Sequence, residues 1–323
     1  MRNEYEEKSP KGAKIAMGFI MLLITTVLLV YLSADHYLNM INRESAADFA
    51  AADSESFDGG GAGNGANNAL WTAVEPLNDE KLVNILLIGQ DRRPGEERQR
   101  SDSMVLLSIN PKTKDVAMVS FLRDLYVELP GDYSANRLNT AYALGGFELL
   151  KQTLRMNFGV SVDGCFGVDF DGFRDVIDAV GGVDIELSAP ESEVVGGGAV
   201  AGINHLNGEQ ALEYARIRKL DSDFGRAERQ RKVLSAAIAS LKGSSLKEIT
   251  ALADRLLPCM TSDMSNSQIM STLLYCYAVL NSDIDTYCVP EEGMYRDENI
   301  DGMAVLVPDR KTIRDRLENC LPL

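Results

Sequence analysis

Residues 82–91 read LVNILLIGQD, residues 102–109 read DSMVLLSI and residues 116–123 read VAMVSFLR. Each stretch contains a short apolar run, and these three runs predict consecutive β-strands. The connection between the second and third runs, residues 110–115, reads NPKTKD and has the composition of a turn. We therefore expect the second and third strands to form an antiparallel hairpin. The first strand is expected to belong to the same sheet.

A charged residue stands at one end of each predicted strand. Asp91 follows the first strand, Asp102 precedes the second, and Arg123 follows the third. If the first strand runs up, the second runs down and the third runs up, so all three charges share one edge of the sheet. Carboxylates are ligands of Mg²⁺, and guanidinium groups bind phosphate oxygens in pairs. This edge therefore predicts a site for a metal ion together with a phosphate.

Helices and strands alternate along the remainder of the chain. A helix, a strand, a helix and a strand are expected over residues 138–158, 165–170, 173–180 and 183–187. Beyond residue 244 we expect two helices, followed by strands at 286–290 and 303–307 and a final helix at 309–319. This order predicts an α/β fold, a mixed β-sheet sandwiched by helices.

The N-terminal region predicts a membrane anchor. Residues 15–32 carry no charge and are just long enough to cross a bilayer as a helix. Three lysines precede them, so the positive-inside rule places residues 1–14 in the cytoplasm and the rest of the chain outside the cell. A cleaved signal peptide is the alternative, but residues 31–34 make a poor cleavage site. We expect a single-pass protein of the cell membrane with an extracellular C-terminal domain.

A linker should separate this anchor from the folded domain. Residues 45–68 consist mainly of Ala, Gly, Ser, Asn and Asp, which cannot bury enough apolar area to offset the entropy of ordering them. We therefore predict a flexible extracellular linker over residues 33–81 and an extracellular catalytic domain over residues 82–323.

Composition excludes several classes of function. The net charge of −16 argues against nucleic acid and anionic membrane surfaces as general partners. The five cysteines lack the spacing of a zinc site. An extracellular location permits a disulfide among the last four, Cys259, Cys276, Cys288 and Cys320, although buried free thiols fit the pattern equally.

Histidine chemistry is also disfavoured, because the chain has two histidines. His36 lies just beyond the apolar segment, and His205 lies in residues 202–208, which read as a loop entering a helix. A Ser-His-Asp triad would have to be built on His205, and a structural role is the simpler interpretation. The chemistry must therefore depend on carboxylates, arginines and a bound cation.

A cluster of basic residues between 216 and 232 supplies the second half of the predicted site. The helix that starts near Gly225 has an apolar stripe over residues 233–241, and this stripe extends back through Gln230, Arg229 and Arg226. An arginine that faces the interior is costly unless an anion pairs with it. Asp223 could be that anion in a purely structural network, but a pyrophosphate with its divalent cation balances the whole group better.

Seven short motifs occur in an order that resembles the LytR-CpsA-Psr family. The resemblance covers about residues 82–242, and the predicted anchor stands where this family has one. The motifs are NILLIGQDRR (84–93), SDS (101–103), RD (123–124), VGGVD (180–184), HLNG (205–208), YARIR (214–218) and DFGR (223–226).

The resemblance implies a membrane-anchored phosphotransferase. Such enzymes move a glycopolymer, of the teichoic acid or capsular polysaccharide type, from an undecaprenyl-pyrophosphate carrier to peptidoglycan. By the family pattern Asp91 and Asp102 would hold Mg²⁺, with Mn²⁺ as the alternative ion. The pyrophosphate would be bound by Arg123, Arg216, Arg218, Arg226 and Gln230. Arg123, Asp223 and Arg226 would be the catalytic residues, with Asp223 orienting an arginine or assisting proton transfer.

Two other functions remain compatible with the sequence. One is a polyprenyl-pyrophosphate hydrolase, which would use the same donor site with water as the acceptor. The other is a non-catalytic, membrane-tethered receptor or regulator that senses lipid-linked intermediates. For the prenyl chain of the carrier we expect an apolar tunnel, lined by the predicted helices around residues 141–154 and 173–180.

Overall fold

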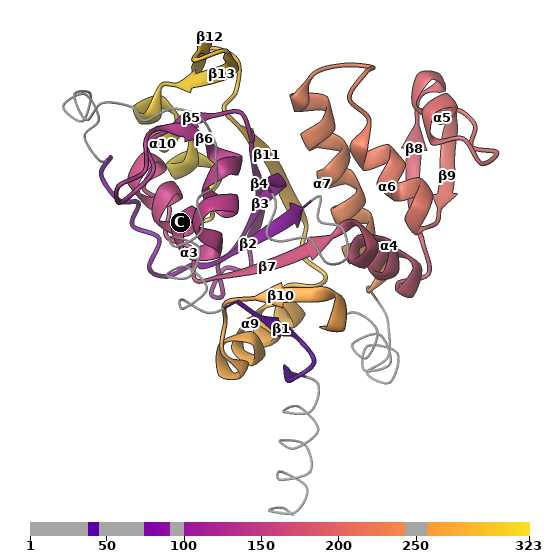
Figure 1. Cartoon of the computed structure of the whole chain (residues 1–323). Coiled ribbons are helices and arrows are strands. Elements are labelled where there is room, and N and C mark those ends of the chain that lie inside the picture. Colours follow the sequence, from indigo (N-terminus) through magenta and orange to yellow (C-terminus); the bar gives the residue numbers. More distant parts are fainter. Residues whose placement is uncertain (1–37, 45–73, 91–99, 243–256) are drawn as a thin grey trace, which may run out of the picture.

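A mixed seven-stranded sheet forms the centre of the molecule (Figure 1). The computed structural model describes residues 38–44, 74–90, 100–242 and 257–323. In spatial order the strands are β1 (Asn42–Arg43), β10 (Met260–Ser262), β7 (Gly164–Asp169), β2 (Val83–Gln90), β3 (Ser101–Ile109), β4 (Val116–Phe121) and β11 (Ile284–Val289).

The predicted hairpin is confirmed. β3 pairs antiparallel with both β2 and β4, and the Asn110 side chain closes the β3–β4 turn by accepting the N–H groups of Lys112 and Thr113. β7 runs parallel to β2, and β11 runs parallel to β4. The C-terminal ends of β2, β4, β7 and β11 and the start of β3 therefore meet at one edge, as the sequence predicts.

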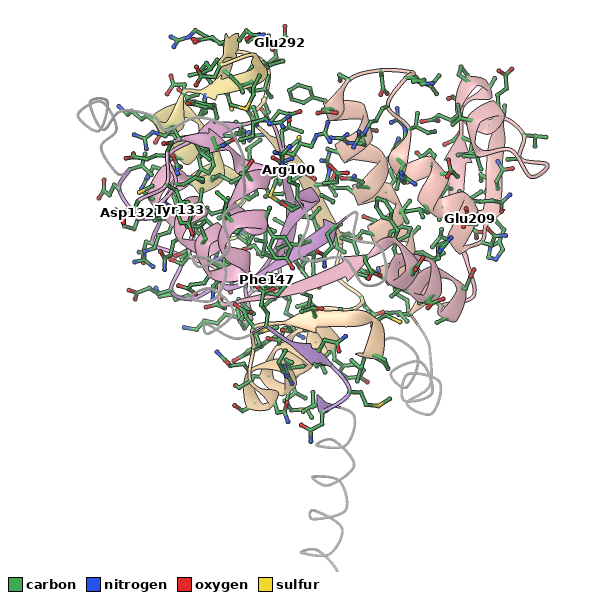
Figure 2. The ribbon with its side chains drawn as sticks, viewed as in Figure 1. Arg100, Asp132, Tyr133, Phe147, Glu209 and Glu292 are labelled. Carbon is green, nitrogen blue, oxygen red and sulfur yellow. The ribbon has the colours of Figure 1, made fainter. Side chains whose placement is uncertain are left out.

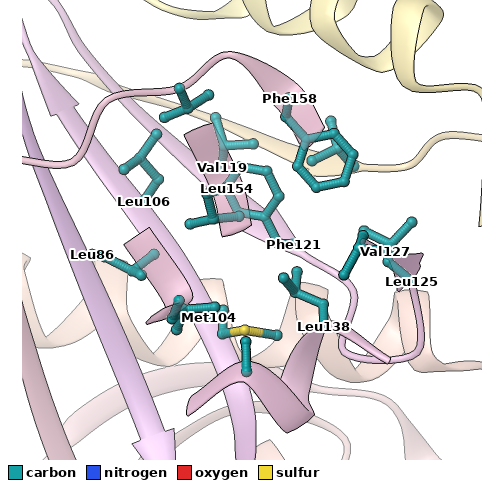
Figure 3. Close-up of a cluster of buried hydrophobic side chains, with 14 of the residues drawn as sticks. Leu86, Met104, Leu106, Val119, Phe121, Leu125, Val127, Leu138, Leu154 and Phe158 are labelled. Carbon is teal, nitrogen blue, oxygen red and sulfur yellow. The ribbon is translucent and has the colours of Figure 1, made fainter. Parts of the chain in front are cut away.

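One face of the sheet carries the main hydrophobic core. Helices α3 (Leu138–Phe158) and α10 (Arg310–Cys320) cover this face, and Figure 3 shows Leu86, Leu106 and Phe121 of the sheet packed with Leu154 and Phe158 of α3. The helix is interrupted at Gly145 and Gly146, which have non-helical dihedral angles. Gly146 has a φ of 61°, which glycine adopts readily.

The opposite face is covered by α4 (Phe170–Ala179), α6 (Gly208–Arg216) and α7 (Asp223–Ser240), which lie to the right of the sheet in Figure 1. A second, smaller core joins these helices to a hairpin and a short helix. The hairpin consists of β8 (Val183–Leu187) and β9 (Gly202–Leu206), and the helix is α5 (Ala189–Val195).

The prediction of a loop over residues 202–208 is wrong for residues 202–206. Residues 202–206 form strand β9, because pairing with β8 satisfies their backbone groups. Its side chains alternate weakly between buried and exposed, and Ile203 is 78% exposed, so the sequence pattern lacks a clear strand signal.

The remaining elements lie at the periphery. They are β5 (Tyr126–Val127), β6 (Asn136–Arg137), the 3₁₀ turn η1 (Leu257–Cys259), α9 (Asn266–Ala278), β12 (Tyr295–Ile300) and β13 (Met303–Pro308). All five cysteines are free thiols, so the disulfide that the sequence permits is not formed.

Two pieces of the expected linker belong to the folded domain. Leu38 and Ile41 are buried against Ile85 and Met264, and the β1 strand that follows them pairs with β10. Leu77 is also buried, and its N–H donates to the carbonyl of Gly159. Because the apolar residues of both pieces form runs too short to show a helical or strand period, the predicted domain start at residue 82 comes too late for both pieces.

The predicted anchor, residues 15–32, lies outside the described residues. None of the helices within the described ranges is long and apolar enough to cross a membrane.

The early part of the domain should matter for stability. Asp79 is buried and accepts hydrogen bonds from the Ser161 N–H at 2.9 Å and from the Asn84 side chain at 3.1 Å. We expect Asp79→Ala to lower the free energy of unfolding by about 2–3 kcal/mol, because it leaves both buried donors unpaired. Chemical denaturation measures this change. Asp132→Ala, at an exposed position that Figure 2 shows on the periphery, is the matched control and should change little. Equal effects of the two substitutions would refute a structural role for Asp79.

Candidate functional site

The predicted site residues come together where the sheet edge meets α6 and α7. Asp102 lies at the start of β3, and Arg123 lies two residues after β4. Arg216 ends α6, whereas Arg226 and Gln230 lie in the first half of α7; Arg218 lies between the two helices. The other predicted metal ligand, Asp91, lies outside the described residues.

The local sequence fixes where α6 begins. Asn207 and Gln210 form a capping box, in which the Asn207 side chain accepts the Gln210 N–H at 3.0 Å. The helix then runs to Arg216, whose guanidinium carbon lies 4.4 Å from the ring centroid of Phe170. This cation–π contact holds the exposed end of Arg216 beside the start of α4.

Arg229 fixes the segment between α6 and α7. It is 3% exposed, and its guanidinium donates to Glu191 at 3.0 Å, to the Ile217 carbonyl at 2.9 Å and to Asp221. Gly225 makes the Asp221 contact possible, because a Cβ atom there would lie 2.1 Å from an Asp221 carboxylate oxygen. The inward-facing Arg229 that the helical stripe predicts is therefore a structural residue with a full set of partners.

Asp102 joins the two halves of the site. One carboxylate oxygen accepts from Arg123 at 2.8 Å, and the other accepts from Arg218 at 3.1 Å. Burial lowers the pKa of Arg123, but the hydrogen bond to Asp102 and the charges of Asp124 and Asp223 outweigh it and raise the pKa overall. Arg123 is therefore a permanent cation at the edge of the sheet.

Two further residues complete this network and were missed by the sequence analysis. Asp124 lies 3.4 Å from Arg123 and 3.1 Å from Arg137, which comes from β6. Asp124 directly follows Arg123, and that adjacency was the one available signal for it. Nothing in the sequence around Arg137 distinguishes it from an ordinary surface arginine.

Asp124 and Asp223 form a carboxyl pair whose two pKa values are shifted in opposite directions. Burial and a hydrogen bond to Asp223 raise the pKa of Asp124 above its ordinary value. Burial alone would raise the pKa of Asp223 too, but the hydrogen bond from Asp124 and the charges of Arg226 and Arg123 lower it overall. Asp124 is therefore the carboxyl of the pair that takes up a proton first as the pH falls, and Asp223 stays ionised to lower pH.

Arg226 is the buried cation that the helical pattern predicts. It is 4% exposed, and one terminal nitrogen, Nη2, lies 3.0 Å from Asp223. The other, Nη1, is buried and has no hydrogen-bond partner among the described residues. Burial lowers the pKa of Arg226, and repulsion from Arg123 and Arg218 acts in the same direction, against the attraction of Asp223. A buried N–H donor without a partner is costly, so this side chain is suited to an anion.

A cavity of about 230 Å³ opens between the sheet and helices α4, α6 and α7. Its polarity changes along α7, from Arg226 and Gln230 to Val233 and Ala237. We call the first region the polar end, which is lined by Asp102, Arg216, Arg218, Arg226 and Gln230. We call the second region the apolar body, whose lining includes Leu87, Val105, Phe166, Phe173, Val176 and Val233.

The predicted tunnel lining is half correct. Phe173, Val176 and Ile177 of α4 line the cavity, as expected for residues 173–180. Residues 141–154 do not, because α3 packs on the opposite face of the sheet. Whether a helix lines the cavity depends on which face of the sheet it covers, and the sequence does not reveal that face.

Of the two predicted metal ligands, only Asp102 lies within the described residues. Among the residues that the structure places, no three Asp, Glu, His or Cys side chains gather around one point. Asp102 offers one carboxylate at the polar end of the cavity. Mg²⁺ commonly takes one or two carboxylates together with substrate phosphates, so the chemistry of Asp102 fits such an ion.

His205 has a structural environment. Its two ring nitrogens lie 2.8 Å from an Asp184 carboxylate oxygen and 2.8 Å from the Gly181 carbonyl. The hydrogen bond to Asp184 is the main cause of the raised pKa of His205. These contacts join β9 to β8, away from the residues lining the cavity.

The chain matches known proteins over most of its length. The model of the LytR_cpsA_psr family matches residues 38–320. The polyisoprenyl-teichoic acid–peptidoglycan teichoic acid transferase TagU of Bacillus mycoides (strain KBAB4) is 38% identical over 193 residues, covering 59% of this chain and 60% of that protein. The protein of the same description named TagV, from Bacillus subtilis (strain 168), is 31% identical over 318 residues, or 93% of this chain and 78% of that protein.

A solved structure shares the fold. TagT bound to LI-WTA superimposes with a TM-score of 0.62 and 26% identity, covering 78% of this chain and 97% of that chain. The predicted mixed sheet between helices is therefore confirmed as the architecture of this group. The match to TagU spans 60% of the length of that relative. The match over residues 38–320 shows that the chain belongs to the LytR-CpsA-Psr family.

Proposed function

We propose that this protein is a membrane-anchored, extracellular phosphotransferase that moves a glycopolymer from a polyprenyl-pyrophosphate carrier to peptidoglycan. One observation carries the proposal: the buried, unpartnered Nη1 of Arg226 beside a cavity that is charged at one end and apolar in its body. A polyprenyl pyrophosphate has the same division into a multiply charged head and an apolar chain.

The charges at the polar end support an anionic ligand. Five arginines at or next to the polar end, at positions 123, 137, 216, 218 and 226, meet four carboxyl groups, those of Asp102, Asp124 and Asp223 and that of Asp169, which also lines the cavity. Even with all four carboxyls ionised, an excess of one positive charge remains among these residues. Arg226 Nη1 and the exposed Arg216 would donate to pyrophosphate oxygens as charge-assisted hydrogen bonds.

The apolar body supports a lipid carrier. Leu87, Val105 and Phe166 of the sheet face Phe173 and Val233 of the helices across the cavity. Burying an apolar chain against such side chains is favourable in proportion to the area removed from water. The part of the prenyl chain next to the pyrophosphate would occupy this space.

In the proposed reaction an acceptor hydroxyl attacks the phosphorus nearer the glycan. The new O–P bond forms as the bond to the bridging oxygen breaks, and polyprenyl phosphate leaves. Arg123, Arg218 and Arg226 would stabilise the charge that develops on the phosphate oxygens. Asp223, which is ionised, would accept the hydroxyl proton, and Asp124 and Arg123 would hold its carboxylate in place.

A divalent cation is part of the proposal. Asp102, together with Asp91, would hold Mg²⁺, or alternatively Mn²⁺, at the polar end. When bound, the ion would neutralise negative charge on the pyrophosphate. All the other roles in the proposed reaction belong to side chains of this chain.

The relatives support the transfer reaction over the alternatives. TagU and TagV bear the description of teichoic acid–peptidoglycan transferases, and TagT has been solved bound to LI-WTA. A hydrolase would use the same donor site with water, so the choice depends on the acceptor. Incubating the protein with donor and peptidoglycan fragments and finding only released glycopolymer phosphate would contradict transfer.

The first prediction concerns the pyrophosphate contact. Arg216→Ala should weaken binding of a polyprenyl pyrophosphate by about 10- to 100-fold, because a charge-assisted hydrogen bond to the ligand is lost. Titration calorimetry measures the affinity. Arg174→Ala is the matched control, since Arg174 also lies on a helix surface near α6 but pairs with Glu209 at 2.8 Å instead of lining the cavity. Figure 2 shows Glu209 on the side of α6 away from the sheet. Similar affinities for the two variants would count against the site.

The second prediction separates the two paired carboxyls. Asp223→Asn should lower kcat by about 10²- to 10⁴-fold, because it removes the proton acceptor. Asp124→Asn should retain most of the activity, because an amide can donate to Asp223 as the protonated carboxyl does. Comparable losses in kcat for both variants would show that Asp124 and Asp223 do not have separate roles.

The same pair predicts a pH effect on stability. Because the folded-state pKa of Asp124 is raised, its stabilising contribution is fully present below the ordinary value of 3.8 and is lost as the pH rises through the folded value. Asp223 has a lowered pKa, so its contribution is present above 3.8 and is lost only at more acidic pH. Asp124→Asn should therefore flatten the free energy of unfolding against pH just above 3.8. An unchanged slope in denaturation experiments would contradict the assignment.

The last prediction in this group concerns the metal. Treatment with a chelator should abolish turnover, and added Mg²⁺ should restore it. Asp102→Asn should raise the Mg²⁺ concentration for half-maximal turnover by about tenfold or more. Asp171→Asn, at an exposed position on α4, is the control. Full activity in the presence of the chelator would refute the metal requirement.

A further inference from the structure

Helix α9 (Asn266–Ala278) exposes an apolar face on the outside of the domain. Its inner side packs through Ile269 and Thr272, which are buried. On its outer side Leu273, Leu274 and Tyr277 are 47%, 64% and 71% exposed. Met270 recurs with them at intervals of three and four residues and so lies on the same stripe of the helix, but it is half-buried and also packs against the core.

This outer stripe is unusual for a helix in contact with water. Surface helices of soluble domains normally carry charged or polar residues on the face opposite the core. α9 contains no Asp, Glu, Lys or Arg, although the chain as a whole has a net charge of −16. Contiguous exposed apolar residues of this kind mark surfaces that contact another apolar phase or partner.

The position of α9 identifies that partner. Arg43, from β1, donates hydrogen bonds to the Leu38 carbonyl at 3.0 Å and to the Asn266 side chain at the start of α9. Asn266 in turn donates to Asn39 at 3.0 Å. Figure 1 shows β1, β10 and α9 together at one end of the molecule. The first described residues of the chain are therefore attached directly to α9.

Chain length then limits the distance from α9 to the membrane. Leu38 follows the end of the uncharged segment, residues 15–32, by six positions. Six residues span at most about 20 Å even when fully extended. If that segment crosses the bilayer, the start of α9 must lie close to the lipid surface.

We propose that the outer face of α9, formed by Met270, Leu273, Leu274 and Tyr277, rests in the headgroup region of the lipid bilayer that holds the N-terminal segment. This inference rests on the membrane anchor of the proposed function. Tyrosine is enriched at membrane interfaces, and leucine side chains reach the acyl boundary. The absence of charge on α9 removes the repulsion that an acidic surface would meet at anionic lipids.

The anchor makes even a weak contact effective. A face attached within about 20 Å of the bilayer meets it at a high effective concentration, so α9 needs little affinity of its own. Seating α9 in the interface would also orient the cavity. Met260 of β10 lines the cavity, and β10 pairs with β1 and leads towards α9. The apolar body would then lie on the membrane side of the sheet, where a prenyl chain leaves the bilayer.

A fluorescent reporter can test this contact in the full chain. The chain has one tryptophan, Trp71, so Trp71→Phe gives a background without tryptophan emission. Tyr277→Trp then places a reporter on the outer face of α9, and Ile203→Trp places a matched reporter on β9, which is equally exposed but lies on another side of the molecule in Figure 1. Each protein is reconstituted into phosphatidylcholine–phosphatidylglycerol vesicles with brominated acyl chains.

We expect the brominated lipids to quench the reporter at position 277 at least about twofold more than the reporter at position 203, and aqueous acrylamide to quench it less. Equal acrylamide quenching at both positions would overturn the proposal. A reporter at position 277 shielded from both quenchers would also overturn it, because a protein partner or a second copy would then cover α9.

Sedimentation of the same vesicles distinguishes failure of the α9 contact from failure of the proposed membrane anchor. A chain that stays in the supernatant would refute the membrane anchor and the seating of α9 together. A chain that sediments with the vesicles, but whose reporter at position 277 is not quenched by the lipids, would refute only the seating of α9.

Discussion

The site depends on one costly arrangement, the buried guanidinium of Arg226, one nitrogen of which has no acceptor in the part of the chain that the structure describes. Burying a cation is unfavourable unless counter-charges and hydrogen bonds compensate for the lost hydration. Asp223 compensates in part at 3.0 Å, and the remaining donor lies next to the cavity. The stability of the folded protein and the affinity for an anion are therefore linked, because a bound phosphate would supply the missing acceptor.

Arg229, one turn further along α7, differs from Arg226 in that the protein itself supplies partners for its guanidinium group. Arg229 is as deeply buried as Arg226, but its guanidinium has Glu191, Asp221 and a backbone carbonyl as partners. Helix α7 thus carries one arginine that is saturated by the protein and another that is not. The saturated residue fixes the α6–α7 segment, on which Arg218 is presented, while Arg226 keeps a donor for the ligand. Burial alone does not distinguish a structural arginine from a binding one, whereas the count of its partners does.

The sequence predicts those features that local pattern determines. The β3–β4 hairpin follows from two apolar runs joined by the turn at residues 110–115, and the inward direction of Arg226 follows from the helical stripe. Arg137 was missed because its importance depends on β6 approaching the end of β4, and Asp124, although it lies in the RD motif, was not assigned a role because its pairing with Arg137 depends on the same approach. Leu38 was missed because residues 37–41 form too short a mainly apolar run to show a period, and its burial depends on Met264 and Ile269, more than 200 positions away.

The lack of a side chain at Gly225 affects residues outside its own turn of helix α7. Glycine within a helix is less stable than alanine by about 1 kcal/mol, so the position would ordinarily favour a side chain. Here a side chain would collide with Asp221, displace it from Arg229 and loosen the segment that carries Arg218. Natural variation at this position should accordingly be narrow, although glycine contributes no functional group. A search for important positions that considers only ligand contacts would pass over it.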